Sequence, residues 1–92
     1  MAIESAEYGQ TRVAQVSARP LSAIAADIRA DWTKPYFGAV PYLDAMASLN
    51  AISDNYFQDS ARSVVLYFLS NATSWRGDTA RRIKAELKAM VK

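Results

Sequence analysis

Two aspartates spaced four residues apart are the closest this sequence comes to a reactive pair. Asp27 and Asp31 would lie one above the other on a helix, and paired carboxylates can transfer protons or hold a cation. No converging set of other reactive residues accompanies them, and Arg29 and Lys34 are near enough in the chain to neutralise them. We therefore interpret the pair as a solvated helix face.

The segment that begins at Asp54 resembles a calcium-binding loop only in part. Gln58 stands at a ligand position, and both the glycine required at the sixth place and the bidentate glutamate required at the twelfth are missing. The motifs GxSxG, GxGxxG and Walker A are absent as well. We reject a calcium site and expect no bound metal.

The 92-residue chain contains neither histidine nor cysteine. Their absence excludes disulfides, thiolate catalysis and the commonest zinc, copper and haem ligands, and it removes the usual general base. Carboxylates, lysines and tyrosines remain available, but without a converging arrangement. We predict that the protein is not an enzyme, has no catalytic residues and needs no cofactor.

Aromatic residues gather around the expected loops, and they have two interpretations. In a small domain, loop aromatics commonly fill the ends of the core. Alternatively they form an exposed patch for a protein partner, because Trp, Tyr and Arg dominate binding hot spots. On this second interpretation the candidate partner-binding residues are Tyr36, Phe37, Trp75 and Arg76.

Charge is distributed unevenly along the chain, although its net value is only +2. Residues 21–60 carry two basic and five acidic side chains, and residues 76–92 carry six basic and two acidic ones. The basic end is explained as a solvated helix face, as a surface that docks on acidic protein or on a second copy of the chain, or as a contact with nucleic acid. The candidate nucleic-acid-binding residues are Arg81, Lys84, Lys88 and Lys92. The sequence contains no zinc-finger, RNA-recognition or helix-turn-helix pattern that would support a contact with nucleic acid.

The elements that would position these residues are four helices, predicted at 21–32, 41–50, 61–72 and 79–91. An apolar stripe at helical spacing marks the first one, with Ser22 as its expected N-cap. That stripe consists of Leu21, Ile24, Ala25, Ile28 and Trp32. Pro41 suits the first turn of the second helix, which follows a compact linker at 33–40. The stripe of the second helix consists of Tyr42, Ala45, Met46 and Leu49.

The third helix is expected to be capped by Asp59 or Ser60. Residues 64–69 are apolar on every side, so a buried strand is the alternative, and we favour a central buried helix. The last helix begins at Gly77 or Asp78 and has a heptad-like seam. That seam consists of Ala80, Ile83, Leu87 and Met90. The predicted fold class is all-α, a small antiparallel bundle of about four short helices.

Residues 1–20 differ from the rest, and we divide the chain into an N-terminal arm at 1–20 and a single helical domain at 21–92. The arm is expected to be flexible, or else to place an edge strand at 10–17 against a partner chain. No apolar run approaches the roughly 20 residues that cross a bilayer, and Met1–Gln10 lacks the basic stretch of a signal peptide. We expect a cytoplasmic protein that does not bind membranes.

Two strings carry a resemblance: Lys34–Leu43 (KPYFGAVPYL) and Trp75–Lys88 (WRGDTARRIKAELK). They resemble small uncharacterised helical proteins of actinobacteria and of the bacteriophages that infect them, over about Arg19–Lys92. The family supplies no catalytic residues to transfer. The resemblance implies a setting, a phage or prophage gene product in the cytoplasm of its host, where small proteins often bind a host protein or DNA.

Together these observations predict a non-catalytic protein-binding module that modulates a host protein. The alternative is a small nucleic-acid-binding protein that uses its basic C-terminal helix.

Overall fold

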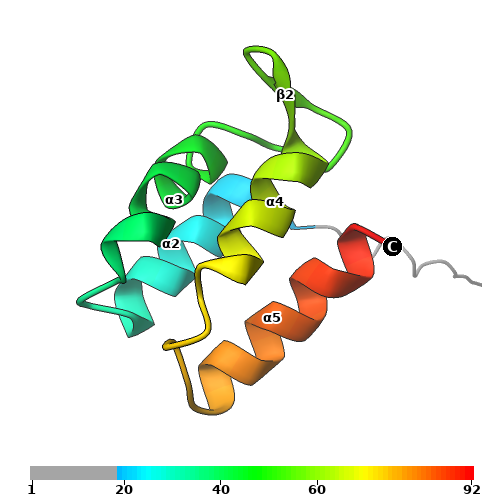
Figure 1. Ribbon diagram of the computed structural model, residues 1–92. Helices are drawn as coiled ribbons and strands as arrows, with labels where there is room; N and C mark the ends of the chain where they lie inside the picture. The colour runs from blue at the N-terminus through cyan, green and yellow to red at the C-terminus, as the bar shows by residue number, and fades with distance from the viewer. Residues whose placement is uncertain (1–18) are drawn as a thin grey trace, which may run out of the picture.

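The computed structural model describes residues 19–92. The predicted strand at 10–17 and all but the last two residues of the predicted arm lie outside the described residues. In chain order the elements are α2 (Leu21–Asp31), the 3-10 helix η2 (Phe37–Ala39), α3 (Val40–Met46), β1 (Asn55–Tyr56), β2 (Asp59–Ser60), α4 (Ala61–Ser70) and α5 (Asp78–Met90). Helices dominate the described residues, and one small two-stranded sheet lies in the chain between α3 and α4 (Figure 1).

Helix α2 begins at the predicted residue, ends one residue before the predicted end, and has the predicted buried face. All five residues of its stripe, from Leu21 to Trp32, are buried in the core. The prediction of Ser22 as the N-cap is wrong, because the helix already begins at Leu21 after Pro20. The first backbone N–H groups of a helix need outside acceptors. Here the N–H groups of Leu21 and Ser22 donate to the carbonyls of Asn50 and Leu49, at 2.8 and 2.9 Å, which ties the start of α2 to the end of the following helical unit.

The second predicted helix is shorter than expected and begins differently. Part of the expected linker forms η2, and α3 follows it directly with Pro41 in its first turn, where the missing N–H is harmless. The α-helix ends at Met46, and Leu49 beyond it is buried nonetheless. Leu43, which the predicted stripe omitted, is fully buried.

A β-hairpin corrects the purely helical fold class. Strands β1 and β2 pair antiparallel, with Asn55 opposite Ser60 and Tyr56 opposite Asp59, so Phe57 and Gln58 form a two-residue loop. The hairpin projects from the helices (Figure 1). The protein is therefore mostly helical with a small sheet. That its helices make a regular antiparallel bundle stays a prediction.

Helix α4 confirms the helical prediction for this apolar segment over the strand alternative. Ser60 caps it, and its hydroxyl accepts a hydrogen bond from the N–H of Ser63 at 3.0 Å. The prediction of burial on every side is wrong, because Leu66 and Tyr67 are exposed while Phe68 is buried. One face of α4 packs on the core and the other faces outward.

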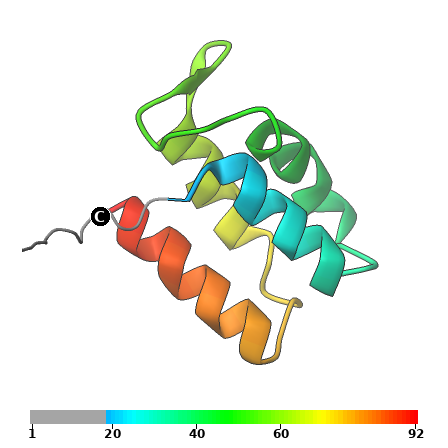
Figure 2. The same cartoon turned by 180° about the vertical axis from the view of Figure 1, so that it is seen from behind.

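The core lies where the four α-helices meet. Helix α3 contacts α2 and α4, and α5 contacts α2 and α4, as the two opposite views show (Figures 1 and 2). The predicted seam of α5 is confirmed, with Ala80, Ile83 and Leu87 buried and Met90 packed at the edge of the core. None of the described helices is long and apolar enough to pass through a membrane.

Candidate protein-binding surface

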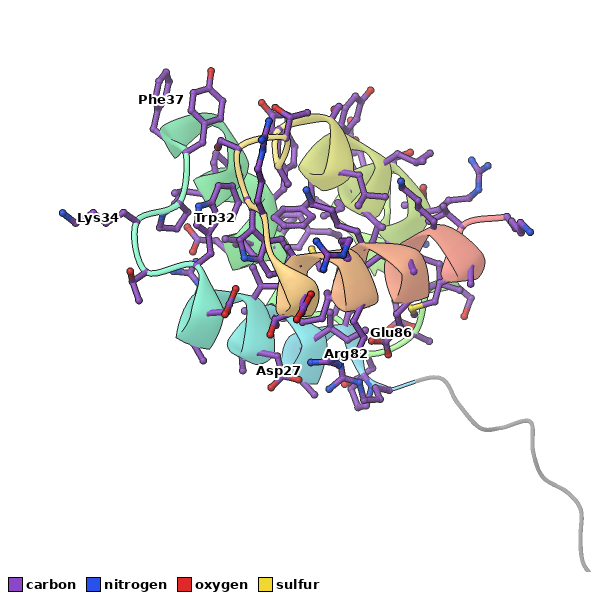
Figure 3. The ribbon with its side chains drawn as sticks, turned by 90° about the horizontal axis from the view of Figure 1, so that it is seen from below. Asp27, Trp32, Lys34, Phe37, Arg82 and Glu86 are labelled. Atoms are coloured by element: carbon purple, nitrogen blue, oxygen red, sulfur yellow. The ribbon has the colours of Figure 1, made fainter. Side chains whose placement is uncertain are left out.

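Four aromatic side chains gather where η2, α3 and α4 come together, and we call them the aromatic patch: Tyr36, Phe37, Tyr42 and Tyr67. The ring centroids of Tyr36 and Phe37 are 4.8 Å apart, and those of Tyr42 and Tyr67 are 5.6 Å apart in a stacked arrangement. Phe37 is 79% exposed, Tyr67 54% and Tyr36 47%. Figure 3 shows Phe37 pointing away from the body of the molecule. Large rings therefore lie together on the surface, where folding alone does not require them.

Gly38 lets the ring of Tyr36 lie beside the end of α4, the helix that carries Tyr67. A Cβ atom at this position would stand 2.5 Å from Cε2 of Tyr36 and 2.8 Å from Oδ1 of Asn71, closer than side chains tolerate. The amide of Asn71 donates to the carbonyl of Tyr67 at 2.8 Å. The ring of Tyr36 thus lies over the glycine backbone beside the end of α4, a position that only glycine leaves open.

Trp75 does not belong to this surface, and its prediction as an exposed partner contact is wrong. Its side chain is 2% exposed. It stacks on Trp32 with a centroid separation of 5.8 Å and meets the edge of Phe68 at 6.4 Å, and we call these three residues the buried aromatic cluster. For Trp32 and Trp75 the alternative interpretation, that loop aromatics fill the core, is confirmed.

Polar groups satisfy the buried indole and the loop that carries it. The indole N–H of Trp75 donates to Asp31 at 2.8 Å, and the ammonium of Lys84 donates to the Trp75 carbonyl at 2.6 Å while lying over its ring. Arg76, the neighbour of Trp75, is exposed. It is therefore separated from the buried ring, and its role in partner binding stays a prediction.

The basic face of α5 is only partly free for nucleic acid. Arg81 pairs with Asp78 in the first turn, and Lys84 is half-buried against Trp75. Burial lowers the pKa of Lys84, and the positive charges of Lys88 and Arg76 lower it further. The structure therefore uses Lys84 for packing. Arg81, Lys88 and Lys92 are exposed, and Arg81 is the one of these three that pairs with an acidic side chain, Asp78.

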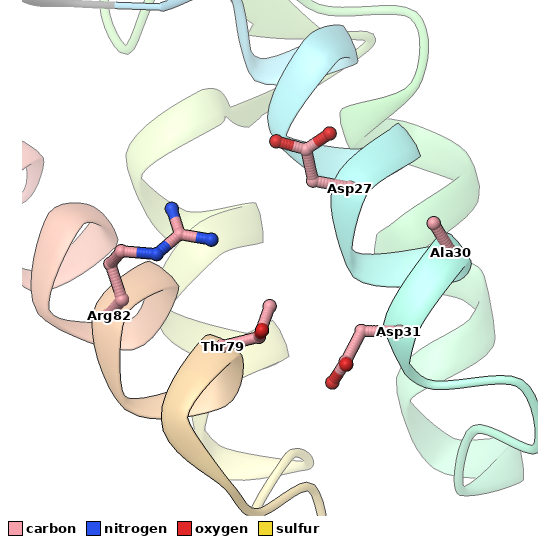
Figure 4. A pocket seen from close by; sticks show the side chains of 5 residues that line it. All are labelled: Asp27, Ala30, Asp31, Thr79 and Arg82. Atoms are coloured by element: carbon pink, nitrogen blue, oxygen red, sulfur yellow. The ribbon is translucent and has the colours of Figure 1, made fainter.

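A shallow polar cleft of about 330 Å³ separates α2 from α5, and it contains the paired aspartates Asp27 and Asp31 (Figure 4). Its lining residues are Asp27, Ala30, Asp31, Thr79 and Arg82. Both carboxylates already have partners, since Asp27 pairs with Arg19 and Asp31 accepts from Trp75. Within residues 19–92, no three Asp or Glu side chains converge to hold a metal ion. The pair serves the packing of α2 against α5, and its partners differ from the expected Arg29 and Lys34.

Tyr67 and Tyr42 are not among the partner-binding residues predicted from the sequence. Tyr67 belongs to the apolar stretch at 64–69. Tyr42 belongs to the same group of loop aromatics as Tyr36 and Phe37 but also to the apolar stripe of the second predicted helix. A helical wheel that places Val64, Val65 and Phe68 inside leaves Tyr67 outside, so the signal existed for Tyr67. The pairing of Tyr42 with Tyr67 depends on how α3 packs against α4, which periodicity does not give.

Comparisons with protein-family models, with curated proteins and with solved structures found no significant match to this chain. The case for a function therefore rests on the geometry of the described residues.

Proposed function

We propose that this protein is a non-catalytic protein-binding module and that the aromatic patch is its contact surface. The observation that carries the proposal is the exposure of Phe37, Tyr36 and Tyr67, with Tyr36 against Phe37 and Tyr67 stacked on Tyr42. Aromatic residues are enriched in interfaces and in their hot spots. Tyrosine suits this role because its ring supplies apolar contact area while its hydroxyl bonds the partner at little entropic cost.

The size of the patch supports a specific interface. Each aromatic side chain can bury roughly 150–250 Å², and a stable interface needs about 800 Å² from each partner. At their exposed fractions, Phe37, Tyr67 and Tyr36 offer roughly 270–450 Å² of that area, and the residues around them would supply the rest. Stacking of Tyr42 on Tyr67 and the seat of Tyr36 on Gly38 hold the rings in place before binding, which lowers the entropy lost on association.

The partner that we propose is a host protein, in the setting that the sequence resemblance implies. The exposed Lys34 lies in the linker three residues before Phe37, and its side chain points outward (Figure 3). An apolar partner surface with an acidic rim would match this arrangement. Such a contact would let a small phage-borne protein modulate a larger host factor.

Site-specific photocrosslinking tests the proposal. A photoreactive phenylalanine analogue is placed at position 37, and the protein is exposed to an extract of actinobacterial host cells. The same analogue at position 66 is the matched control, because Leu66 is 40% exposed on α4 but outside the patch. We expect one dominant crosslinked protein from position 37 and none of it from position 66.

Titration of the purified partner then measures the contribution of each ring. Phe37→Ala or Tyr67→Ala should weaken binding by roughly 10- to 100-fold, as hot-spot truncations do, and Leu66→Ala should change it less than about twofold. Equal crosslinking at both positions, or unchanged affinity in folded Phe37→Ala protein, would refute the aromatic patch as the contact surface.

A further inference from the structure

The tip of the hairpin combines two unfavourable features in one residue. Phe57 has a φ of +57°, although the first position of a two-residue loop with positive φ favours Gly, Asn or Asp. Its side chain is also 87% exposed, with only the edge of Tyr56 against its ring at 4.7 Å. A bulky side chain in this backbone region is a genuine outlier. Neither the fold nor the aromatic patch accounts for it.

An apolar cleft of about 360 Å³ lies at another place on the surface, beside the start of α2 and the end of α5. It is lined by Arg19, Pro20, Asn50, Ala51, Ile52 and Met90. Its volume lies within the range of pockets that hold small ligands, about 300–1,000 Å³, so one phenyl ring can enter. Most of the lining is apolar, which gives a phenyl ring a favourable environment.

The wall of this cleft is held in place by the loop at 50–54. The carboxylate of Asp54 accepts the backbone N–H groups of Asn50 and Ala51 at 3.0 and 2.9 Å. These hydrogen bonds lower the pKa of Asp54, the Ala51 bond most. On the other side, Arg19 is fixed by ion pairs to Glu86 and Asp27. The cleft is therefore formed before any ligand arrives.

The charges of the hairpin and the cleft are complementary. The hairpin, residues 55–60, contains Asp59 and no basic residue, whereas Asp54 precedes it and is bonded to the cleft wall. Around Met90 the charges are positive: Lys88 and Lys92 are close in sequence, and Arg62 donates to the carbonyl of Val91 at 2.9 Å. An acidic hairpin is attracted to this basic end of α5 and is repelled by an anionic lipid surface.

We propose that the ring of Phe57 docks in the apolar cleft of a second copy of this chain. One chain carries both the exposed ring and the vacant apolar wall, with opposite charges beside them. Because a single ring buries little area, the association is transient. It uses a different surface from the aromatic patch and does not depend on the proposed function.

Sedimentation velocity tests this self-association between about 10 µM and about 1 mM, the range in which weak protein contacts dissociate. We expect the wild type to shift reversibly from monomer toward dimer or larger species as its concentration rises. Phe57→Gly should stay monomeric and should also unfold at a higher temperature, because glycine accepts the positive φ. Phe37→Ala, in the aromatic patch, should associate like the wild type. A wild type that stays monomeric at about 1 mM, or association that persists in Phe57→Gly, overturns the proposal.

Mixing two variants identifies the cleft as the acceptor. Ala51 is exposed on the cleft wall, so Ala51→Glu introduces a charge that repels the acidic hairpin without opening the core. Each variant alone, Ala51→Glu or Phe57→Gly, should be monomeric. Their equimolar mixture should form dimers again, because one supplies the ring and the other supplies the intact cleft. A mixture as monomeric as its components would mean that Phe57 does not enter this cleft.

Discussion

The buried aromatic cluster and the aromatic patch are built from the same kind of residue, yet one is core and the other is surface. Trp32 of the cluster and Tyr36 of the patch are only four positions apart in the chain. In the cluster, Asp31 accepts the indole N–H of Trp75, and Lys84 donates to its carbonyl. In the patch, rings pair with one another and with solvent. Burial here therefore depends on packing from the neighbouring helices and on polar partners for the indole, because aromatic character and nearness to a loop do not separate the two regions.

The largest expected difference between the two regions is in the free energy of unfolding after one ring is removed from each. Trp75→Ala should lower the free energy of unfolding by about 3–5 kcal/mol, because it empties a fully packed site, and a small domain has little more stability than that. Phe37→Ala should change it by less than about 0.5 kcal/mol, as exposed substitutions do. Urea unfolding followed by circular dichroism measures both. Similar losses in the two variants would show that the patch is part of the core.

Replacing one glycine near each region should again lower stability by different amounts, and both losses should be smaller than that of Trp75→Ala. Gly77 precedes α5 with a φ of +111°, and a Cβ there meets no neighbouring atom. Gly77→Ala should therefore cost about 1–3 kcal/mol through backbone strain alone. The measurement is thermal or urea unfolding of the variant beside the wild type.

Gly38→Ala is the counterpart in the patch, where the new methyl group meets Cε2 of Tyr36 and Oδ1 of Asn71. The half-exposed Tyr36 ring can rotate away, so stability should fall less than in Gly77→Ala while the ring leaves its seat. NMR chemical shifts of Tyr36 would report that movement. A larger loss of stability at Gly38 than at Gly77 would contradict this account.

The first and last of the described α-helices, α2 and α5, were predictable from the sequence for a physical reason. In α2 and α5 the larger apolar residues recur at helical spacing with polar residues or alanine between them, so the pattern identifies both the element and its buried face. From Leu21 to Ile28, and again from Ala80 to Leu87, the predicted positions are the buried ones. Local periodicity is enough when one helix face packs on one core.

The hairpin and the aromatic sites were not predictable in the same way. Phe57-Gln58 lacks the Asn-Gly or Gly-containing pair that signals a two-residue loop, so β1 and β2 left no pattern. Trp75 is buried because α2 supplies Asp31 from 44 residues away in the chain. Contacts of this kind depend on tertiary packing, which one sequence does not display.

The hydrogen bond between Asp31 and Trp75 should carry a modest part of the difference between the two regions. Asp31→Ala leaves the indole N–H without its acceptor and should lower stability by about 1–1.5 kcal/mol, toward the low end because Asp31 is exposed and water can reach the site. Asp31→Asn keeps an acceptor oxygen and should lose less. Asp44→Ala, which breaks an exposed ion pair with Arg29, is the matched control and should lose at most about 1 kcal/mol. Chemical denaturation of the three variants gives the order, and an equal loss in Asp31→Ala and Asp44→Ala would show that the bond adds nothing.

The smallest expected effect comes from the charge of Lys84 beside the buried aromatic cluster. Its pKa is lowered on folding by burial and by Lys88 and Arg76, so the unfolded state binds its proton more tightly than the folded state does. Stability then rises with pH between the lowered folded pKa and the ordinary value of 10.5. As the pH rises from 7 to 10.5, the free energy of unfolding of the wild type should increase by less than about 1 kcal/mol relative to that of Lys84→Gln. The increase is small because solvent still reaches the ammonium.

The comparison with Lys84→Gln cancels the titration of the tyrosines in the same pH range, since both proteins carry all five. Lys92→Gln removes one exposed charge and serves as the control. If the free energy of unfolding of the wild type instead fell relative to that of Lys84→Gln as the pH rises, the hydrogen bond from Lys84 to the Trp75 carbonyl would outweigh the burial of the ammonium. Lys84 would then stabilise the buried aromatic cluster chiefly as a cation, and the contrast with the uncharged aromatic patch would be electrostatic as well as steric.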